Sequence, residues 1–149
     1  MKYEEYLKES KSKLDTLPIF FAFSDKQFDD EMKKRGLSGK DTKKVFSLGN
    51  GGYYLRSDAQ IIRDFFNQKD ELPELMKDKE FAEGAFLYEM FNHEFAINMQ
   101  GAWEVCECFG ECEYQECKTG PEYLKEMGFG DETIAAYRAA KERYYDKVS

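Results

Sequence analysis

The sequence predicts an α+β fold that is mostly helical, with a small antiparallel sheet made of a strand at about 19–23 and a hairpin at 43–56. Two patterns predict this class. Apolar residues recur at helical spacing through most of the chain, and short strand-like runs occur only in those two segments. Because no repeat, low-complexity tract or linker divides the 149 residues, we expect a single domain over 1–149.

The first elements follow from apolar spacing and a capping pattern. Residues 3–14 alternate charged and apolar side chains as an amphipathic helix does. The run IFFAF at 19–23 is typical of a buried strand. Ser24 and Gln27 have the spacing of a capping box, which predicts a helix from this point to about Arg35.

The hairpin at 43–56 turns at GNGG, whose glycines and asparagine tolerate a positive φ. This loop lacks the G-x-x-x-x-G-K-[ST] spacing of a phosphate-binding loop, so we interpret it as a turn and not as a nucleotide site. Ser57 and Gln60 repeat the capping-box spacing, and the apolar residues after them predict the next helix.

The C-terminal half has the spacing of several helices. Residues 78–97 carry a wide apolar face and predict a long helix, which Gly101 and the cysteines after it interrupt. Pro121 suits the first turn of a short helix that ends at Met127. Asp131 is a typical N-cap for the last helix.

Negative charge is concentrated in one third of the chain. The formal net charge is −8, but residues 70–117 alone contain 13 Asp and Glu against Lys77 and Lys79, a net charge of −11. The other 101 residues therefore carry +3. Such a segment repels nucleic acid and attracts basic surfaces, although many acidic proteins use the same charge only for solubility.

Composition also restricts the compartment. No apolar run approaches the roughly 18 residues that a membrane span requires. The first residues, MKYEEYLKESKSKLD, are charged and lack the apolar stretch of a signal peptide. We therefore expect a protein of the bacterial cytoplasm with no membrane partner, where thiols are kept reduced.

All four cysteines lie in the segment CECFGECEYQEC, at Cys106, Cys108, Cys112 and Cys117. The spacing C-x-C-x3-C-x4-C differs from the two C-x2-4-C hooks of common structural zinc sites, and the intervening glutamates add negative charge. Three alternatives remain open: unpaired thiols, which the pattern favours, a zinc site formed by the four thiolates, and disulfides. No cofactor is expected unless the zinc site forms.

The single histidine, His93, occurs in FNHEF. Its neighbour Glu94 points about 100° away on a helix, so the two side chains do not address one substrate atom. The zinc motif H-E-x-x-H is not completed, and no nucleophile is paired with the histidine in sequence. We interpret His93 as a hydrogen-bonded packing residue. A meeting of His93 with Cys106 or Cys108 in space stays open.

Three runs carry a resemblance to a known group of proteins: LPIFFAFSDKQFDDEMKKRGL, KKVFSLGNGGYYLRSDA and YEMFNHEF. They resemble an uncharacterised family of small acidic proteins from gut bacteria and their phages or mobile elements. The resemblance covers roughly residues 1–95 and recurs weakly in GFGDETIAAYRAAK. It implies no activity and no catalytic residue. It implies a context in which short acidic accessory proteins bind a host protein.

The sequence thus favours a non-enzymatic accessory protein that presents an acidic surface, as a DNA mimic, to a basic host protein. A nucleic-acid-binding defence nuclease would be such a partner, in an anti-CRISPR-like role without direct contact to nucleic acid. The surface residues predicted to bind the partner are Glu104, Glu107, Glu111, Glu113 and Glu116. The alternative is a small zinc-binding protein or metal-dependent enzyme centred on the cysteines and His93. The oligomeric state stays open.

Overall fold

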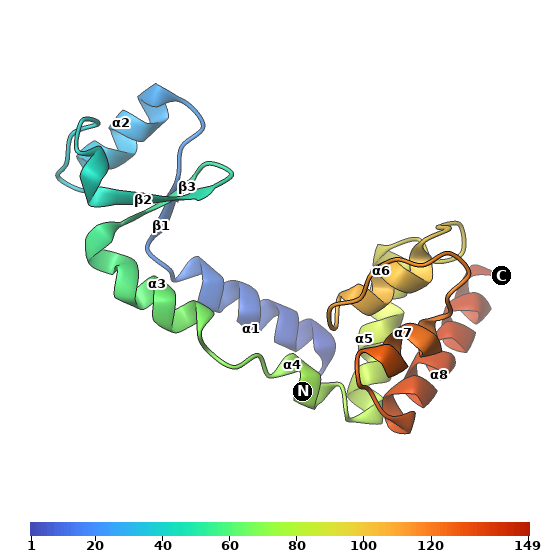
Figure 1. Ribbon diagram of the computed structural model, residues 1–149. Helices are drawn as coiled ribbons and strands as arrows, with labels where there is room; N and C mark the ends of the chain where they lie inside the picture. The colour runs from blue at the N-terminus through green and yellow to red at the C-terminus, as the bar shows by residue number, and fades with distance from the viewer. The chain divides into compact units, whose positions relative to one another are not determined.

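The computed structural model describes residues 1–149 and contains eight α-helices and one three-stranded antiparallel sheet (Figure 1). The predicted α+β class, mostly helical with a small sheet, is confirmed. The chain divides into two compact units: residues 1–9 with 70–149, called here the helical unit, and residues 10–69, called the sheet unit. The expectation of a single domain over 1–149 stays a prediction. None of the helices is both long and apolar enough to cross a bilayer.

The sheet unit contains the predicted strand and hairpin. Its strands are β1 (Ile19–Phe21), β2 (Val45–Gly49) and β3 (Gly52–Leu55), in the order β1-β3-β2. Asn50 and Gly51 turn the hairpin with φ values of 52° and 80°, as the turn residues predict. The helices that complete the unit are the end of α1 (Tyr3–Asp15), then α2 (Asp25–Lys34) and α3 (Ala59–Phe66).

Helix α2 covers one side of the sheet and begins at the predicted cap (Figure 1). Ser24 Oγ accepts a hydrogen bond from the backbone N–H of Gln27, while the Gln27 side chain accepts one from the N–H of Phe23. The second capping-box prediction is wrong, because residues 56–58 form a 3₁₀ turn and Asp58, not Ser57, precedes α3.

The helical unit has a core formed by α5 and α8, which pack along their length. Four fully buried alanines, Ala82, Ala85, Ala136 and Ala140, form what we call the alanine seam between the two helices. The Phe86 ring contacts Phe109 and Tyr137 edge-on. The helices of this unit after α1 are α4 (Leu72–Leu75), α5 (Lys79–Asn92), α6 (Gly101–Glu107), α7 (Gly120–Glu126) and α8 (Asp131–Val148).

Two helix predictions in this region are wrong. The helix expected over 78–97 ends at Asn92, because Glu94 adopts a φ of 50° and the N–H of Phe95 bonds back to the carbonyl of Met90. Helix α6 forms where an interruption was expected, since Gly101 begins a helix instead of ending one. Both differences matter for the site, because they bring the end of α5 beside α6.

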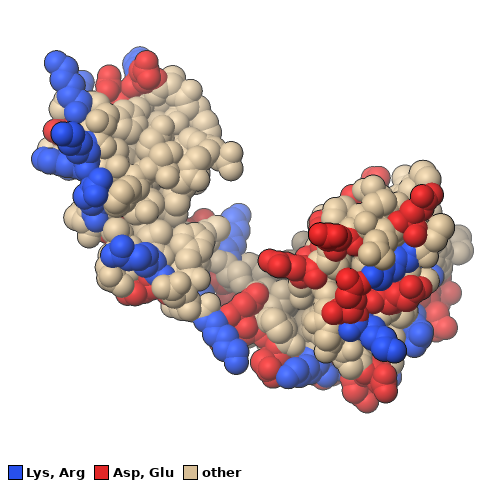
Figure 2. Space-filling model, in the orientation of Figure 1, with Lys and Arg blue, Asp and Glu red and all other residues tan.

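Charge separates between the two units. The helical unit contains 22 acidic and 10 basic residues, a net charge of −12, whereas the sheet unit contains 8 acidic and 12 basic residues, a net charge of +4. Figure 2 shows acidic side chains spread over the helical unit and a row of basic side chains along one edge of the sheet unit. The net charge of −8 is therefore the sum of two parts of opposite sign, −12 and +4.

Candidate metal centre

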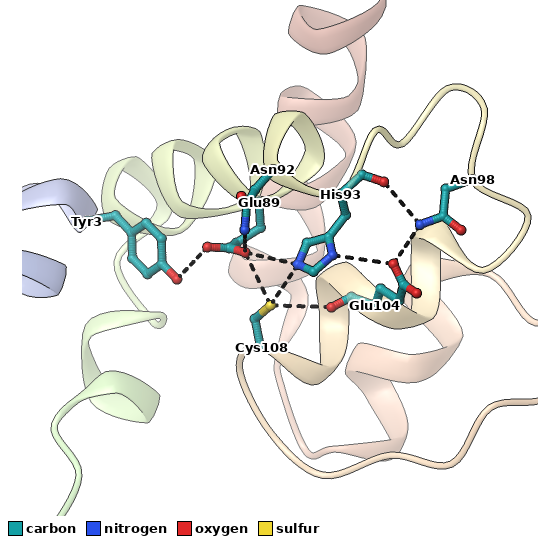
Figure 3. A network of polar contacts seen from close by, with 7 residues as sticks. All are labelled: Tyr3, Glu89, Asn92, His93, Asn98, Glu104 and Cys108. Atoms are coloured by element: carbon teal, nitrogen blue, oxygen red, sulfur yellow. Dashed lines mark hydrogen bonds and ion pairs between the residues drawn. The ribbon is translucent and has the colours of Figure 1, made fainter. Parts of the chain in front are cut away.

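A group of polar side chains lies where the end of α5 faces α6 in the helical unit (Figure 3). Glu89 belongs to α5 and His93, four residues later, is its C-cap residue, so their side chains lie on the same side of the end of that helix. Cys108 is the C-cap residue of α6 and points toward both of them. The three side chains therefore converge from two different helices.

The converging atoms form a nearly equilateral triangle. Glu89 Oε2 lies 3.2 Å from His93 Nε2 and 3.3 Å from Cys108 Sγ. The third side, from Cys108 Sγ to His93 Nε2, measures 3.6 Å. The structure thus confirms the meeting of His93 with a cysteine, which is Cys108.

The second ring nitrogen of the histidine also has a carboxylate partner. His93 Nδ1 lies 3.3 Å from Oε2 of Glu104, a residue of α6. Asn98 holds that carboxylate from the other side, because its Nδ2 lies 2.6 Å from the same oxygen and also donates to the carbonyl of His93. The ring orientation is therefore fixed through both nitrogens.

Glu89 is the buried member of the group. Its side chain is 7% exposed, compared with 28% for His93. Oε1 accepts a hydrogen bond of 3.0 Å from the Tyr3 hydroxyl, and Asn92 Nδ2 lies 3.4 Å from Oε2. A buried carboxylate with a partner on each oxygen is held in one rotamer, whereas the mouth of the site on the His93 side stays open to solvent.

Burial and the negative charge of Glu89 raise the pKa values of two groups at the site, the Cys108 thiol and the Tyr3 hydroxyl. Burial and the neighbouring Glu89 carboxylate raise the pKa of the Cys108 thiol to about 12. The same two causes, burial first, raise the pKa of the Tyr3 hydroxyl well above its ordinary range. Without a cation, both groups therefore stay protonated at neutral pH and act as donors to Glu89.

Two kinds of chemistry fit this set of residue types. Cys108, His93 and Glu104 follow the order nucleophile, base and orienting carboxylate. The Glu89 carboxylate, however, contacts the thiol directly and opposes the thiolate that a nucleophile requires. A metal cation would have the opposite effect on the thiol and favour its deprotonated form. It would stabilise the thiolate, the carboxylate and the neutral imidazole nitrogen at the same time.

The four cysteines predicted as zinc ligands do not form one group of ligand atoms in the structure. All four cysteines are free, so no disulfide forms. Cys106 is fully buried and its thiol lies 3.7 Å from the carbonyl of Gly120, while Cys112 is half-buried and Cys117 is exposed. The group whose ligand atoms lie within 4.8 Å of one another is Glu89, His93 and Cys108. A site formed by all four cysteines stays a prediction.

The five acidic residues predicted to bind a partner fall into two groups in the structure. Glu104 is turned toward His93 and Asn98, and its side chain is 30% exposed. The other four, Glu107, Glu111, Glu113 and Glu116, are exposed and form no ion pair. The acidic loop 107–116 therefore presents unpaired carboxylates, whereas Glu104 belongs to the polar group around the histidine.

Sequence reasoning missed Glu89, Tyr3 and Asn98. The signal for Glu89 was present, because Glu and His four residues apart on a predicted helix share a face. Tyr3 reaches the site from 86 residues away in sequence and left no local signal. Asn98 lies in the loop between α5 and α6, just beyond the helix expected over 78–97, and no local pattern marked it.

Comparisons with known proteins give one match. A model described as "Family of unknown function (DUF7659)" matches residues 2–124, a range that includes Glu89, His93, Glu104 and Cys108. Among curated proteins nothing matches. Among solved structures nothing matches either.

Proposed function

Since the chain belongs to the family of unknown function DUF7659, which brings no assigned activity, we propose a function from the site itself: the protein binds a zinc ion through Glu89, His93 and Cys108. The carrying observation is the size of the triangle formed by the three ligand atoms. Zinc bonds of about 2.0–2.3 Å in a tetrahedron separate neighbouring ligand atoms by roughly 3.3–3.6 Å. The three separations are 3.2, 3.3 and 3.6 Å.

The surroundings support this proposal. Zinc-bound histidines commonly donate their other ring N–H to a carboxylate, which Glu104 supplies at Nδ1. The bound carboxylate is in turn hydrogen-bonded, as Glu89 is by Tyr3. A set of one nitrogen, one sulfur and one carboxylate oxygen suits zinc better than the oxygen-preferring Mg²⁺ or Ca²⁺.

The ion would join α5 to the end of α6 and so stabilise the helical unit. Three protein ligands leave the fourth position of a tetrahedral ion open, which is the ligand count of catalytic zinc sites. The free energy of unfolding should rise with zinc concentration as for any ligand that binds the folded state.

The test is metal content in purified protein and in three variants. The wild type and Cys117→Ser, a matched exposed thiol, should each contain one zinc per chain by elemental analysis, while Cys108→Ser and His93→Gln should lose it. Cobalt added to zinc-free wild type should give the charge-transfer absorption of a cobalt–thiolate bond. Folded wild-type protein that neither contains nor takes up zinc would refute the proposal. Loss of zinc in Cys117→Ser would instead favour the site formed by four cysteines.

A second candidate function concerns the acidic loop 107–116. We propose that it binds a basic surface of a host protein, in the cytoplasm of a bacterial host of a phage or mobile element. A nucleic-acid-binding nuclease is the partner class whose phosphate-binding surface these carboxylates would occupy. The supporting observation is four exposed carboxylates without ion pairs beside Tyr114, which is 41% exposed.

The triple variant Glu107→Lys, Glu111→Lys and Glu113→Lys tests this second function in affinity capture from a bacterial lysate. Its matched control changes the same charge on α1 by Glu4→Lys, Glu5→Lys and Glu9→Lys. A basic partner captured by the wild type and the control, but not by the triple variant, supports the proposal. Unchanged capture by the triple variant would remove the loop from consideration.

A further inference from the structure

A hollow of about 1120 Å³ opens in the sheet unit between α2 and strands β2 and β3. Every residue that lines it lies between positions 22 and 53, so it is separate from the candidate metal centre. Ligand pockets for small molecules typically occupy about 300–1,000 Å³. The hollow is therefore large enough for a ligand of that class.

Three aromatic side chains are part of the lining of the hollow. Phe28 of α2 and Tyr53 of β3 are half-buried and their ring centroids lie 5.1 Å apart. Phe23 lines the rim and is 74% exposed. Rings of this kind offer flat surfaces on which a planar heterocycle stacks.

Two lysines line the same hollow without ion pairs. Lys33 belongs to α2, and Lys40 belongs to the loop that follows it. Their neighbours Lys34 and Arg35 are instead paired with Glu31, at 3.0 and 2.8 Å. Lys33 and Lys40 are therefore the lysines of the lining that are free to meet an anionic ligand.

The lining of the hollow also contains hydrogen-bond acceptors. The carboxylates of Asp25 and Asp29 line the hollow. Carboxylates accept hydrogen bonds from ribose hydroxyls and from the amino groups of bases. The lining thus contains stacking rings, ammonium groups and carboxylates, which together match the base, phosphate and sugar of a nucleotide.

Two glycines keep the hollow open in its present form. At Gly51, where φ is 80°, a Cβ would overlap the ring of Phe23. At Gly39, a Cβ would overlap the carboxylate of Asp29. Larger residues at these positions would displace a rim aromatic and a lining carboxylate.

The electrostatic argument against nucleic acid does not apply to this unit. That argument used the negative charge of residues 70–117, all of which lie in the helical unit. The sheet unit carries +4 and therefore attracts anions on its own.

We propose that the hollow of the sheet unit binds a nucleotide, either free or as part of a single-stranded nucleic acid. The base stacks on the lining rings Phe23 and Tyr53, and the phosphate is bound by Lys33 and Lys40. Both sources present the same chemistry, a planar base linked to an anionic phosphate, and the experiment separates them. The proposal is independent of zinc binding.

The test is titration of the isotope-labelled full-length protein with 5′-mononucleotides and with a short oligothymidylate, followed by amide NMR. Saturable shifts around the hollow are expected. Phe23→Ala should weaken binding about 5- to 150-fold, the range for loss of one base–aromatic stack. The double variant Lys33→Ala, Lys40→Ala should lower the salt dependence of oligonucleotide binding by a slope of about 1.4, since each phosphate contact on a single strand contributes about 0.7.

The controls stay within the same unit. Phe66→Ala removes another exposed ring on α3, and Lys26→Ala removes another cation on α2, both outside the hollow. Neither should change affinity. Saturation by mononucleotides identifies a free nucleotide as the ligand, and binding of the oligonucleotide alone identifies a single strand. The proposal is overturned by absence of saturable binding of either probe, by equal losses in the controls, or by equal competition from tripolyphosphate.

Discussion

The hydroxyl of Tyr3 donates a hydrogen bond of 3.0 Å to Oε1 of Glu89, and this bond joins the first helical turn of the chain to the buried carboxylate of the candidate metal centre. The Tyr3 ring is itself part of the core, where it contacts Phe81 and Phe109. The position of the carboxylate therefore depends on the packing of the N-terminus.

Replacing Tyr3 by phenylalanine keeps the ring and removes the donor. The free energy of unfolding of the zinc-free protein should fall by about 1–3 kcal/mol, the cost of leaving a buried polar group without its partner. Trp103, the single tryptophan, lies in α6 and reports unfolding of the helical unit by fluorescence in urea. Tyr88→Phe is the control, because Tyr88 is partly exposed and packs on the Tyr3 ring. Equal urea midpoints for wild type and Tyr3→Phe would contradict this account.

Glu104→Gln tests the carboxylate that orients His93. Glutamine keeps an oxygen that can accept from Nδ1 but removes the negative charge, so zinc affinity should fall about 10- to 100-fold. Competition with a chromogenic chelator measures the affinity. Glu107→Gln removes an exposed charge three residues away and should leave the affinity within about threefold of wild type, because exposed charges are well screened. Equal affinities of the two variants would mean that Glu104 does not act on the site.

Two glycines of the helical unit should respond oppositely to alanine. At Gly120, a Cβ would overlap the buried ring of Tyr137, so Gly120→Ala should lower the free energy of unfolding by about 1–3 kcal/mol. At Gly84, within α5, the added Cβ would meet no side chain of another element and no backbone outside its own helix within 4 Å. Gly84→Ala should therefore raise stability by about 0.5–1 kcal/mol through helix propensity. Urea unfolding monitored at Trp103 checks both values, and a rise in stability for Gly120→Ala as well would show that the Tyr137 contact is not limiting.

Tyr137 should make the helical unit sensitive to alkali. Burial raises the pKa of its hydroxyl above the ordinary value of 10.0, so the folded state keeps a proton that the unfolded state loses. Stability from this group is therefore full below pH 10 and declines as pH rises further. The urea midpoint of Tyr137→Phe should fall less steeply between pH 9 and 11 than that of the wild type. Tyr145→Phe, at a partly exposed position, should keep the wild-type slope. If the urea midpoint of Tyr137→Phe fell with pH as steeply as that of the wild type, Tyr137 would not be the source of the alkali sensitivity.

The elements that the sequence predicts best are those set by local signals. Ser24 caps α2, and the GNGG turn joins β2 to β3, because capping and positive φ depend on the residues at those positions. The end of α5 was misjudged by five residues, since the apolar pattern continues past Asn92 while the backbone turns at Glu94. Helix α6 was missed because a glycine at its first position resembles a helix stop.

The candidate site was only partly predictable from the sequence, because only some of its contacts depend on local spacing. His93 and Cys108 were recognised as residues that could meet, and Glu89 lies at a spacing that a helix makes contiguous with His93. The contacts of Tyr3 with Glu89 and of Glu104 with His93 depend on tertiary packing, and no local sequence pattern predicts them. The negative excess of residues 70–117 was recognised, but not that residues 1–9 and 118–149 join this segment in one acidic unit.

The alanine seam between α5 and α8 sets a limit on how this protein can diverge. Every side chain along it is already the smallest that carries a Cβ, and each of the four positions is fully buried. A saturation library of these positions should retain glycine and serine at best and lose every larger residue, since added volume has no void to enter. Tolerated substitutions in the helical unit are therefore expected at exposed positions, such as those of the acidic loop 107–116.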